Sequence, residues 1–207
     1  MTLLTLLDAA SVFVFALTGA LVASRAQLDI VGFVFVAALT AVGGGTVRDV
    51  LLDRVPVFWI ANPGYIGIAT AAAVMVFFGA HRLESRLRGI IWLDALALAV
   101  AVPAGAGVAL DLGQSWPIVL FMGVSTGCFG GLMRDVVCNE VPLVLKQGEI
   151  YVSAAFTGAA AAVGAQAAGL EGAAPLALCG ATTFLLRAGG IARGWRLPVY
   201  KSRPPRR

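Results

Sequence analysis

Seven apolar stretches, each about as long as a membrane-spanning helix, alternate with short polar connections along the chain. An α-helix needs about 20 apolar residues to cross the ~30 Å hydrocarbon core of a bilayer. The stretches cover residues 4–24, 28–47, 63–80, 89–110, 115–133, 150–170 and 172–192. The pattern predicts an all-α integral membrane protein with seven transmembrane helices.

Composition supports this environment. Apolar residues make up 59% of the 207 residues and charged residues 13%, and the mean hydropathy is +0.90. A soluble domain carries about 25% charged residues. The net charge of +4 comes from residues that flank apolar stretches, whereas a nucleic-acid-binding protein needs them across a folded, water-facing surface. We therefore expect a lipid bilayer as the surroundings and no nucleic-acid partner.

Basic residues in the short connections predict the orientation. They cluster in connections one, three and five and in the tail: Arg25; Arg82, Arg86 and Arg88; Lys146; and Arg193, Arg196, Lys201, Arg203, Arg206 and Arg207. The opposite set of connections offers Arg54. Because cytoplasmic loops carry an excess of Lys and Arg, the N-terminus is predicted outside and the C-terminus in the cytoplasm.

An internal repeat with a period of 86 residues divides the chain. The block Gly44–Pro56 matches Gly130–Pro142 at seven of thirteen positions, where average residue usage predicts roughly one. We expect a first three-helix repeat over 1–85, a second over 86–171, a seventh helix over 172–192 and a basic tail over 193–207. Three spans per repeat are an odd number, so the second copy enters the membrane inverted, about a pseudo-two-fold axis in the membrane plane.

Glycine clusters occur in the second and fifth stretches of this pattern. Glycine costs about 1 kcal/mol relative to alanine inside a helix, and irregular backbone at membrane depth occurs only where protein or water covers it. A break or kink in both helices, around one water-accessible site, is therefore predicted. The alternative is close helix packing on a smooth glycine face. The residues concerned are Gly43, Gly44, Gly45, Gly127, Gly130 and Gly131.

An Arg-Asp pair follows each cluster: Arg48-Asp49 and Arg134-Asp135. Ionisable residues within a membrane are costly and usually pair with one another beside an aqueous path. Adjacent residues on a helix point about 100° apart, so the hypothesis is pairing across the repeats, Arg48 with Asp135 and Arg134 with Asp49. A salt bridge at each helix end is the alternative.

Three hydroxyl side chains, Thr40, Ser125 and Thr126, lie close to the glycine clusters. Their hydroxyl groups can line a polar path, or they can bond back to a carbonyl of their own helix. The sequence leaves both interpretations open.

Three further charged residues lie within apolar stretches. Asp8 and Asp94 correspond in the repeat, and stabilisation of a helix N-terminus is favoured for them over a role in a pore. Arg187 in the last stretch is expected to snorkel to the cytoplasmic interface.

Enzyme motifs are absent from the sequence: it holds no Walker loop, no G-x-S-x-G elbow and no metal-binding cluster. One histidine, His81, and three scattered cysteines (Cys128, Cys138 and Cys179) offer little for catalysis. We expect neither an enzyme nor a bound cofactor or metal. Transport or conduction is the remaining class of function.

Two segments, Gly43–Trp59 (GGGTVRDVLLDRVPVFW) and Phe129–Leu145 (FGGLMRDVVCNEVPLVL), resemble the trimeric intracellular cation (TRIC) channel family. With the closing Gly194–Pro198 (GWRLP), they are most similar to its bacterial branch, often labelled as glycine-transporter domains. The resemblance implies a homotrimer in the bacterial inner membrane, with a pore for K⁺ and Na⁺ in each protomer.

The same resemblance implies where the pore lies. The second and fifth helices would bound it and be kinked at Gly43–Gly45 and at Gly130 and Gly131. The two Arg-Asp pairs would lie beside it. The permeant K⁺ or Na⁺ would be the only small ligand.

Two other classes of function stay open on the residues alone. Inverted repeats with broken helices are the usual build of secondary transporters, and an arginine in each half suits an anionic group by the sign of its charge. A carrier for a small zwitterion such as glycine is therefore the main alternative, and a scaffold subunit is the third.

Overall fold

The computed structural model describes residues 2–80 and 86–200 of the chain. Of the residues used to predict orientation, Arg82, Lys201, Arg203, Arg206 and Arg207 lie outside this part, as does His81.

Long helices account for every predicted apolar stretch, and the all-α prediction is confirmed. They are α1 (Leu3–Arg25), α2 (Ile30–Leu51), α4 (Gly64–Gly79), α5 (Arg86–Asp111), α6 (Trp116–Val137), α7 (Val152–Ala167) and α8 (Ala174–Arg193). Between them lie a short α3 (Phe58–Ala61) and a 3₁₀ turn, η2 (Leu143–Leu145). Within the described ranges, five helices are long and apolar enough to cross a membrane, while α4 and α7 are shorter apolar helices.

Local sequence sets the helix ends. Asp29 precedes α2, and its carboxylate accepts a hydrogen bond from the Gly32 N–H at 2.8 Å, which satisfies one of the free donors of the first turn. Helix α8 has Pro175 in its first turn, and Gly194 follows its last residue as the C-cap. The φ of +68° at Gly194 lies in the left-handed region, which glycine adopts without steric cost.

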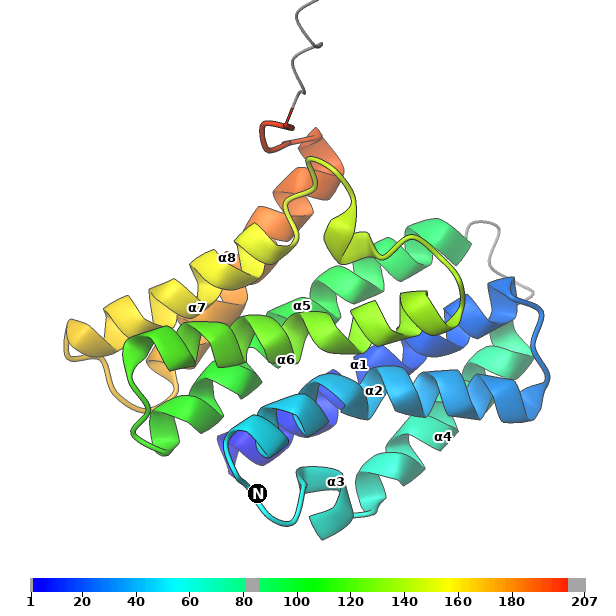
Figure 1. The fold of residues 1–207 in the computed structure, drawn as a ribbon, viewed down its shortest axis with the longest axis horizontal. Coiled ribbons are helices and arrows are strands. Elements are labelled where there is room, and N and C mark those ends of the chain that lie inside the picture. Colours follow the sequence, from blue (N-terminus) through cyan, green and yellow to red (C-terminus); the bar gives the residue numbers. More distant parts are fainter. Residues whose placement is uncertain (1, 81–85, 201–207) are drawn as a thin grey trace, which may run out of the picture.

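The repeat is visible in the packing. Helix α1 packs on α2 and α4, α5 packs on α6 and α7, and the two halves meet through α1 with α5 and α2 with α6. In Figure 1, α2 and α6 lie side by side and run in opposite directions, as an inverted repeat requires. Helix α8 stands outside the repeat and covers α5 and α7.

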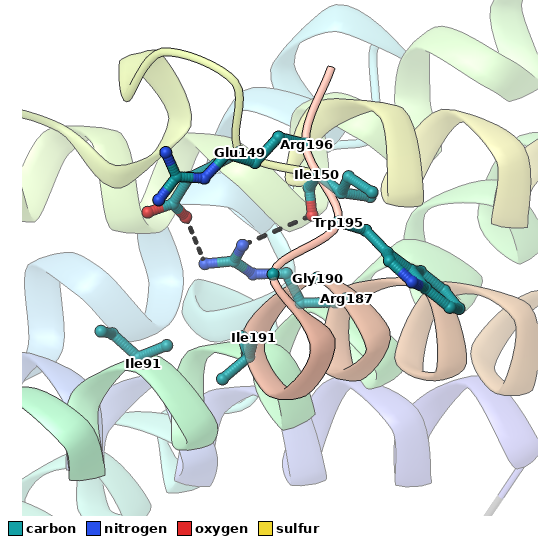
Figure 2. Close-up of a pocket in the computed structure, with 9 residues that line it drawn as sticks. Ile91, Glu149, Ile150, Arg187, Gly190, Ile191, Trp195 and Arg196 are labelled. Carbon is teal, nitrogen blue, oxygen red and sulfur yellow. Dashed lines mark hydrogen bonds and ion pairs between the residues drawn. The ribbon is translucent and has the colours of Figure 1, made fainter.

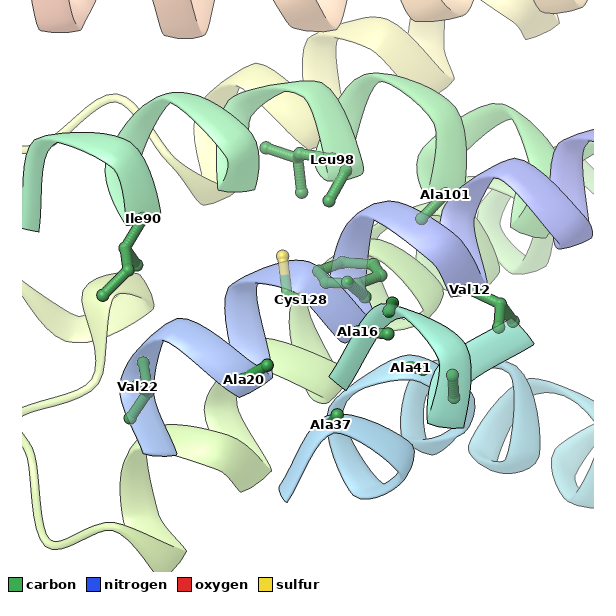
Figure 3. Close-up of a cluster of buried hydrophobic side chains, with 14 of the residues drawn as sticks. Val12, Ala16, Ala20, Val22, Ala37, Ala41, Ile90, Leu98, Ala101 and Cys128 are labelled. Carbon is green, nitrogen blue, oxygen red and sulfur yellow. The ribbon is translucent and has the colours of Figure 1, made fainter. Parts of the chain in front are cut away.

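The buried core between the halves is built largely from small residues. Figure 3 shows Ala16 and Ala20 of α1 between Leu98 of α5 on one side and Ala37 and Ala41 of α2 on the other. In lipid, helices associate through close van der Waals packing, which small side chains permit. This packing brings the polar groups of α1, α2, α5 and α6 within reach of one another.

The glycine clusters do not interrupt their helices, so the predicted break is wrong. Both α2 and α6 continue as α-helix through them. A Cβ on Gly44 would overlap the carbonyl oxygen of Thr126, and a Cβ on Gly130 would overlap that of Thr40. These two glycines therefore let the backbones of α2 and α6 touch, as the packing alternative proposed. A kink within the continuous helices stays a prediction.

Candidate functional site

The first of two buried charge clusters, the outer cluster, is formed by Asp8, Arg48, Asp49 and Arg54. Arg48 is fully buried; its Nε donates to Asp49 Oδ1 and its Nη1 to Asp8 Oδ1, both at 2.8 Å. Arg54 Nη1 also donates to Asp49 Oδ1 at 2.8 Å. The other oxygen of Asp49 accepts the backbone N–H of Phe58, at the start of α3, at 2.8 Å. The cluster thus joins α1, α2 and the turn after α2.

The second cluster, the inner cluster, is formed by Asp94, Arg134 and Asp135. Arg134 is also fully buried; its Nε donates to Asp135 Oδ1 at 2.7 Å and its Nη1 to Asp94 Oδ1 at 3.0 Å. Asp135 Oδ2 accepts the N–H of Leu143 at 2.9 Å. The two ion pairs of Arg134 repeat those of Arg48 in the outer cluster. The backbone contact is shifted by one residue, because the repeat counterpart of Leu143 is Val57 and not Phe58. A further bond, from Arg134 Nη1 to Thr18 Oγ1 at 3.0 Å, ties the cluster to α1 of the first repeat.

The pairing predicted across the repeats is therefore wrong, because each arginine binds the aspartate next to it in sequence. The 100° angle between adjacent residues describes where the side chains leave the helix. An arginine carries its charge at the end of a long, flexible stem, which bends back to the neighbouring carboxylate. Its Nη1 then reaches the aspartate of the preceding helix, Asp8 or Asp94.

Asp8 and Asp94 do not stabilise helix N-termini, so that expectation is also wrong. Helix α1 starts at Leu3, where Thr2 provides the cap, and Asp94 lies well inside α5. Both carboxylates are buried, and a charge at such depth persists when it is paired and hydrogen-bonded. Their role is to complete the pairing of Arg48 and Arg134.

The two clusters differ in charge. Two arginines face two aspartates in the outer cluster, which is formally neutral. The inner cluster sets one arginine against two aspartates, a formal charge of −1. The repeat explains the difference: the counterpart of Arg54 is Glu140, which pairs with Arg25 at 3.3 Å.

The clusters lie at opposite ends of the helix bundle. On α1, Asp8 belongs to the outer cluster and Thr18 binds Arg134 of the inner cluster. These two residues are ten positions apart, which is about 15 Å at a rise of 1.5 Å per residue. A cavity of about 410 Å³ reaches the inner cluster and is lined by Arg134, Asp135, Arg25, Glu140 and Lys146, with apolar side chains between them. Arg25 and Lys146 belong to connections that the sequence predicts to be cytoplasmic.

The three hydroxyl residues are buried between the clusters, where α2 crosses α6. Thr40 Oγ1 donates to the carbonyl of Val36 at 2.6 Å and Ser125 Oγ to that of Met122 at 3.2 Å. For these two, bonding back to their own helix is the observed state. Within the described ranges, the hydroxyl of Thr126 has no hydrogen-bond partner.

Arg187 does not snorkel to the interface, contrary to the expectation. Its side chain is 2% exposed and pairs with Glu149 at 2.8 Å, and its guanidinium lies 5.0 Å from the centre of the Tyr151 ring. Figure 2 shows it directed from α8 towards the segment that precedes α7. Tyr151 in turn donates to Asp94 Oδ2 at 2.5 Å.

Sequence reasoning missed Tyr151, Thr18 and Glu149 as partners of the site. The period of 86 residues pairs Tyr151 with Tyr65 as it pairs Asp94 with Asp8, so the repeat held a signal for the tyrosine. Thr18 has no such signal because its repeat counterpart is Ala104.

Comparison with known proteins gives a consistent result. The family model "Glycine transporter" matches residues 5–81 and 91–167, once in each half. A UPF0126 membrane protein of Vibrio cholerae is 36% identical over 96% of this chain and 83% of its own length. The inner membrane protein YadS of Escherichia coli, of the same UPF0126 group, is 34% identical over 94% of both chains.

Solved structures share the fold. The TRIC trimeric intracellular cation channel orthologue from Rhodobacter sphaeroides superposes with a TM-score of 0.90 at 45% identity, over 94% of this chain and all of that one. A prokaryotic TRIC channel crystallised in 0.5 M KCl superposes with a TM-score of 0.87 at 28% identity, over 92% of this chain and 96% of that one.

Proposed function

Since this chain belongs to the TRIC channel family, through its bacterial branch, we propose that it is a K⁺-permeable channel for monovalent cations. The family consists of channels and not of enzymes. In the proposed assembly, three copies of the chain form a homotrimer and each protomer carries its own pore.

The observation that carries the proposal is the pair of buried charge clusters at opposite ends of the antiparallel α2–α6 pair. Buried charges are costly in lipid and occur mainly along ion or substrate paths. We propose that the path follows α2 and α6, with Arg48 and Asp49 beside one end and Arg134 and Asp135 beside the other. Thr40, Ser125 and Thr126 lie between these ends.

The charge balance removes an objection to a cation. An unpaired arginine would repel K⁺, but Arg48 and Arg134 are each bound by two carboxylates. The inner cluster carries a formal excess of one negative charge, which favours a cation over an anion beside it. The lining of its cavity holds both signs, with Asp135 and Glu140 beside Arg25, Arg134 and Lys146.

We further propose that the protein lies in the bacterial inner membrane with its N-terminus outside and its C-terminus in the cytoplasm. The relative from Escherichia coli is described as an inner membrane protein. In this orientation the inner cluster and its cavity face the cytoplasm, and the outer cluster faces the opposite side.

Planar-bilayer recording of the purified protein tests the function. Unitary currents in symmetric KCl, and a reversal potential close to the K⁺ equilibrium potential in a KCl gradient, are expected. Silent bilayers together with saturable, gradient-driven uptake of glycine into liposomes would refute the channel and establish the carrier. Native mass spectrometry tests the assembly, where a species of three 21.3 kDa chains is expected.

A further inference from the structure

Helix α8 lies outside the repeat, yet it contributes a buried cation next to the inner cluster. Arg187 Nη2 lies 2.8 Å from Glu149 Oε2 and its Nη1 donates to the Ile150 carbonyl at 3.4 Å. Figure 2 shows both contacts, with Arg196 beside Glu149 and Trp195 apart from them, both from the segment after α8. Arg187 thus holds the two residues that immediately precede Tyr151.

The segment that carries Glu149 is itself held by the residues that follow α8. The N–H of Leu197 donates to the Gly148 carbonyl at 2.9 Å, and Glu149 forms an antiparallel bridge with Arg196. Arg187 therefore contacts a segment held by backbone hydrogen bonds, which limits how far Glu149 and Tyr151 can move.

The corresponding tyrosine of the first repeat shows what the site is like without α8. Tyr65 packs its ring edge-on against Phe58, with 4.9 Å between ring centres. Among the described residues, no hydrogen bond joins Tyr65 to Asp8. In the second repeat, the guanidinium of Arg187 lies over the ring of Tyr151, and the hydroxyl binds Asp94. The difference between the two tyrosines thus coincides with the presence of Arg187.

We infer that Arg187 is a positioning residue that holds Tyr151 on Asp94 and thereby keeps Arg134 in place at the end of the inner cavity. Asp94 uses one oxygen for Tyr151 and the other for Arg134. Loss of the tyrosine bond leaves Asp94 free to rotate, and Arg134 then moves away from its place in the lining of the cavity. Through this chain of contacts, α8 controls the inner end of the path.

The expected effect on conduction rests on the proposed function and concerns the frequency of opening. Neither Arg187 nor Tyr151 lines the inner cavity, so their removal changes how often the path opens rather than how much current an open path carries. The ratio of open to closed time should rise about tenfold, the scale expected when a hydrogen bond to a charged group is lost.

Four variants and one matched control test the inference in bilayers. Arg187→Met removes the charge, Tyr151→Phe removes the hydroxyl alone, and the double variant combines them. If Arg187 acts through Tyr151, the double variant opens no more often than either single variant. Arg187→Lys keeps the cation and should restore wild-type gating. Tyr65→Phe, the repeat counterpart, should leave gating unchanged.

Cysteine labelling supplies a readout that does not need a current. Cys138 lies half-buried just after α6, and its N–H bonds to the carbonyl of Arg134 at 3.0 Å. Because Cys138 thus lies one helical turn after Arg134, displacement of the Arg134 side chain should loosen the packing beside Cys138. Its reaction with a thiol reagent that does not cross membranes, applied from the cytoplasmic side, should then be faster. The buried Cys128 and Cys179 should stay unmodified, as peptide mass mapping would verify.

Each outcome of these experiments either supports the inference or overturns it. Equal increases in opening and in Cys138 labelling for both single variants, with no addition in the double, support the inference. Additive effects, or an Arg187→Met variant that only unfolds at lower temperature with unchanged gating and labelling, overturn it. If wild-type protein conducts nothing, the proposed function fails, and the labelling results alone still decide whether Arg187 positions the inner cluster.

Discussion

The contact between α2 and α6 predicts an unusual sensitivity to a single methyl group. In Gly44→Ala, the new Cβ would overlap the carbonyl oxygen of Thr126 and lie 3.0 Å from its carbonyl carbon, where ordinary contact begins at 3.4 Å. Backbone atoms cannot rotate away as a side chain can, so the helices must separate, by about 1 Å. A gap of that size forfeits about a quarter to a half of the dispersion energy of the facing atoms.

We expect Gly44→Ala to lower the free energy of unfolding by about 3 kcal/mol, the upper end of the cost of overpacking. Gly164→Ala in α7 is the matched control, since a Cβ there meets nothing within 4 Å. Alanine should leave that position unchanged or stabilise it by up to about 1 kcal/mol through helix propensity. Denaturation of the purified variants in mild detergent, followed by circular dichroism, measures the difference.

The repeat adds a sharper test, because Gly130 faces the Thr40 carbonyl in the same way. Once one methyl group has separated the helices, the second meets less resistance. Gly44→Ala combined with Gly130→Ala should therefore cost clearly less than the sum of the single variants, as coupled neighbouring sites do. Equal stability of Gly44→Ala and Gly164→Ala, or strict additivity of the pair, would refute the argument that these glycines serve a backbone contact.

Two further predictions concern charge and orientation. Asp94→Asn leaves Arg134 with Asp135 as its remaining carboxylate partner and should cost about 3–5 kcal/mol, as breaking a buried pair does. Glu140→Gln, in a pair whose side chains are each 33% exposed, should lower the free energy of unfolding by less than about 1 kcal/mol. If unfolding in detergent shows similar losses for Asp94→Asn and Glu140→Gln, the argument from burial is wrong. For orientation, a thiol reagent added outside cells should label Leu112→Cys and not Leu145→Cys, both at exposed positions. The reverse pattern would invert the proposed topology.

Much of the fold follows from the sequence because it depends on local patterns. The apolar stretches alone predict the seven long helices to within a few residues, since the bilayer thickness sets their length. The period of 86 residues predicts two like halves, and an odd number of spans predicts their inversion. The same period identifies Arg48 and Arg134 as special, because a charge that occurs twice at membrane depth needs a partner each time.

The partners themselves were decided only by the tertiary structure. The angle between adjacent residues placed Arg48 and Arg134 with the wrong carboxylates, because a long side chain ends far from where it leaves the helix. The glycines were open to two interpretations until the α2–α6 contact showed which carbonyl oxygens they face.

Arg187 is the clearest example of a residue whose surroundings the sequence could not predict. As a charge near a basic tail it is typical of an interfacial residue, and it is buried only because α8 packs against α5 and α7. The sequence determined which residues recur and which segments enter the membrane. The distances between charged groups, on which the proposed path and its proposed control depend, arise from how the helices pack.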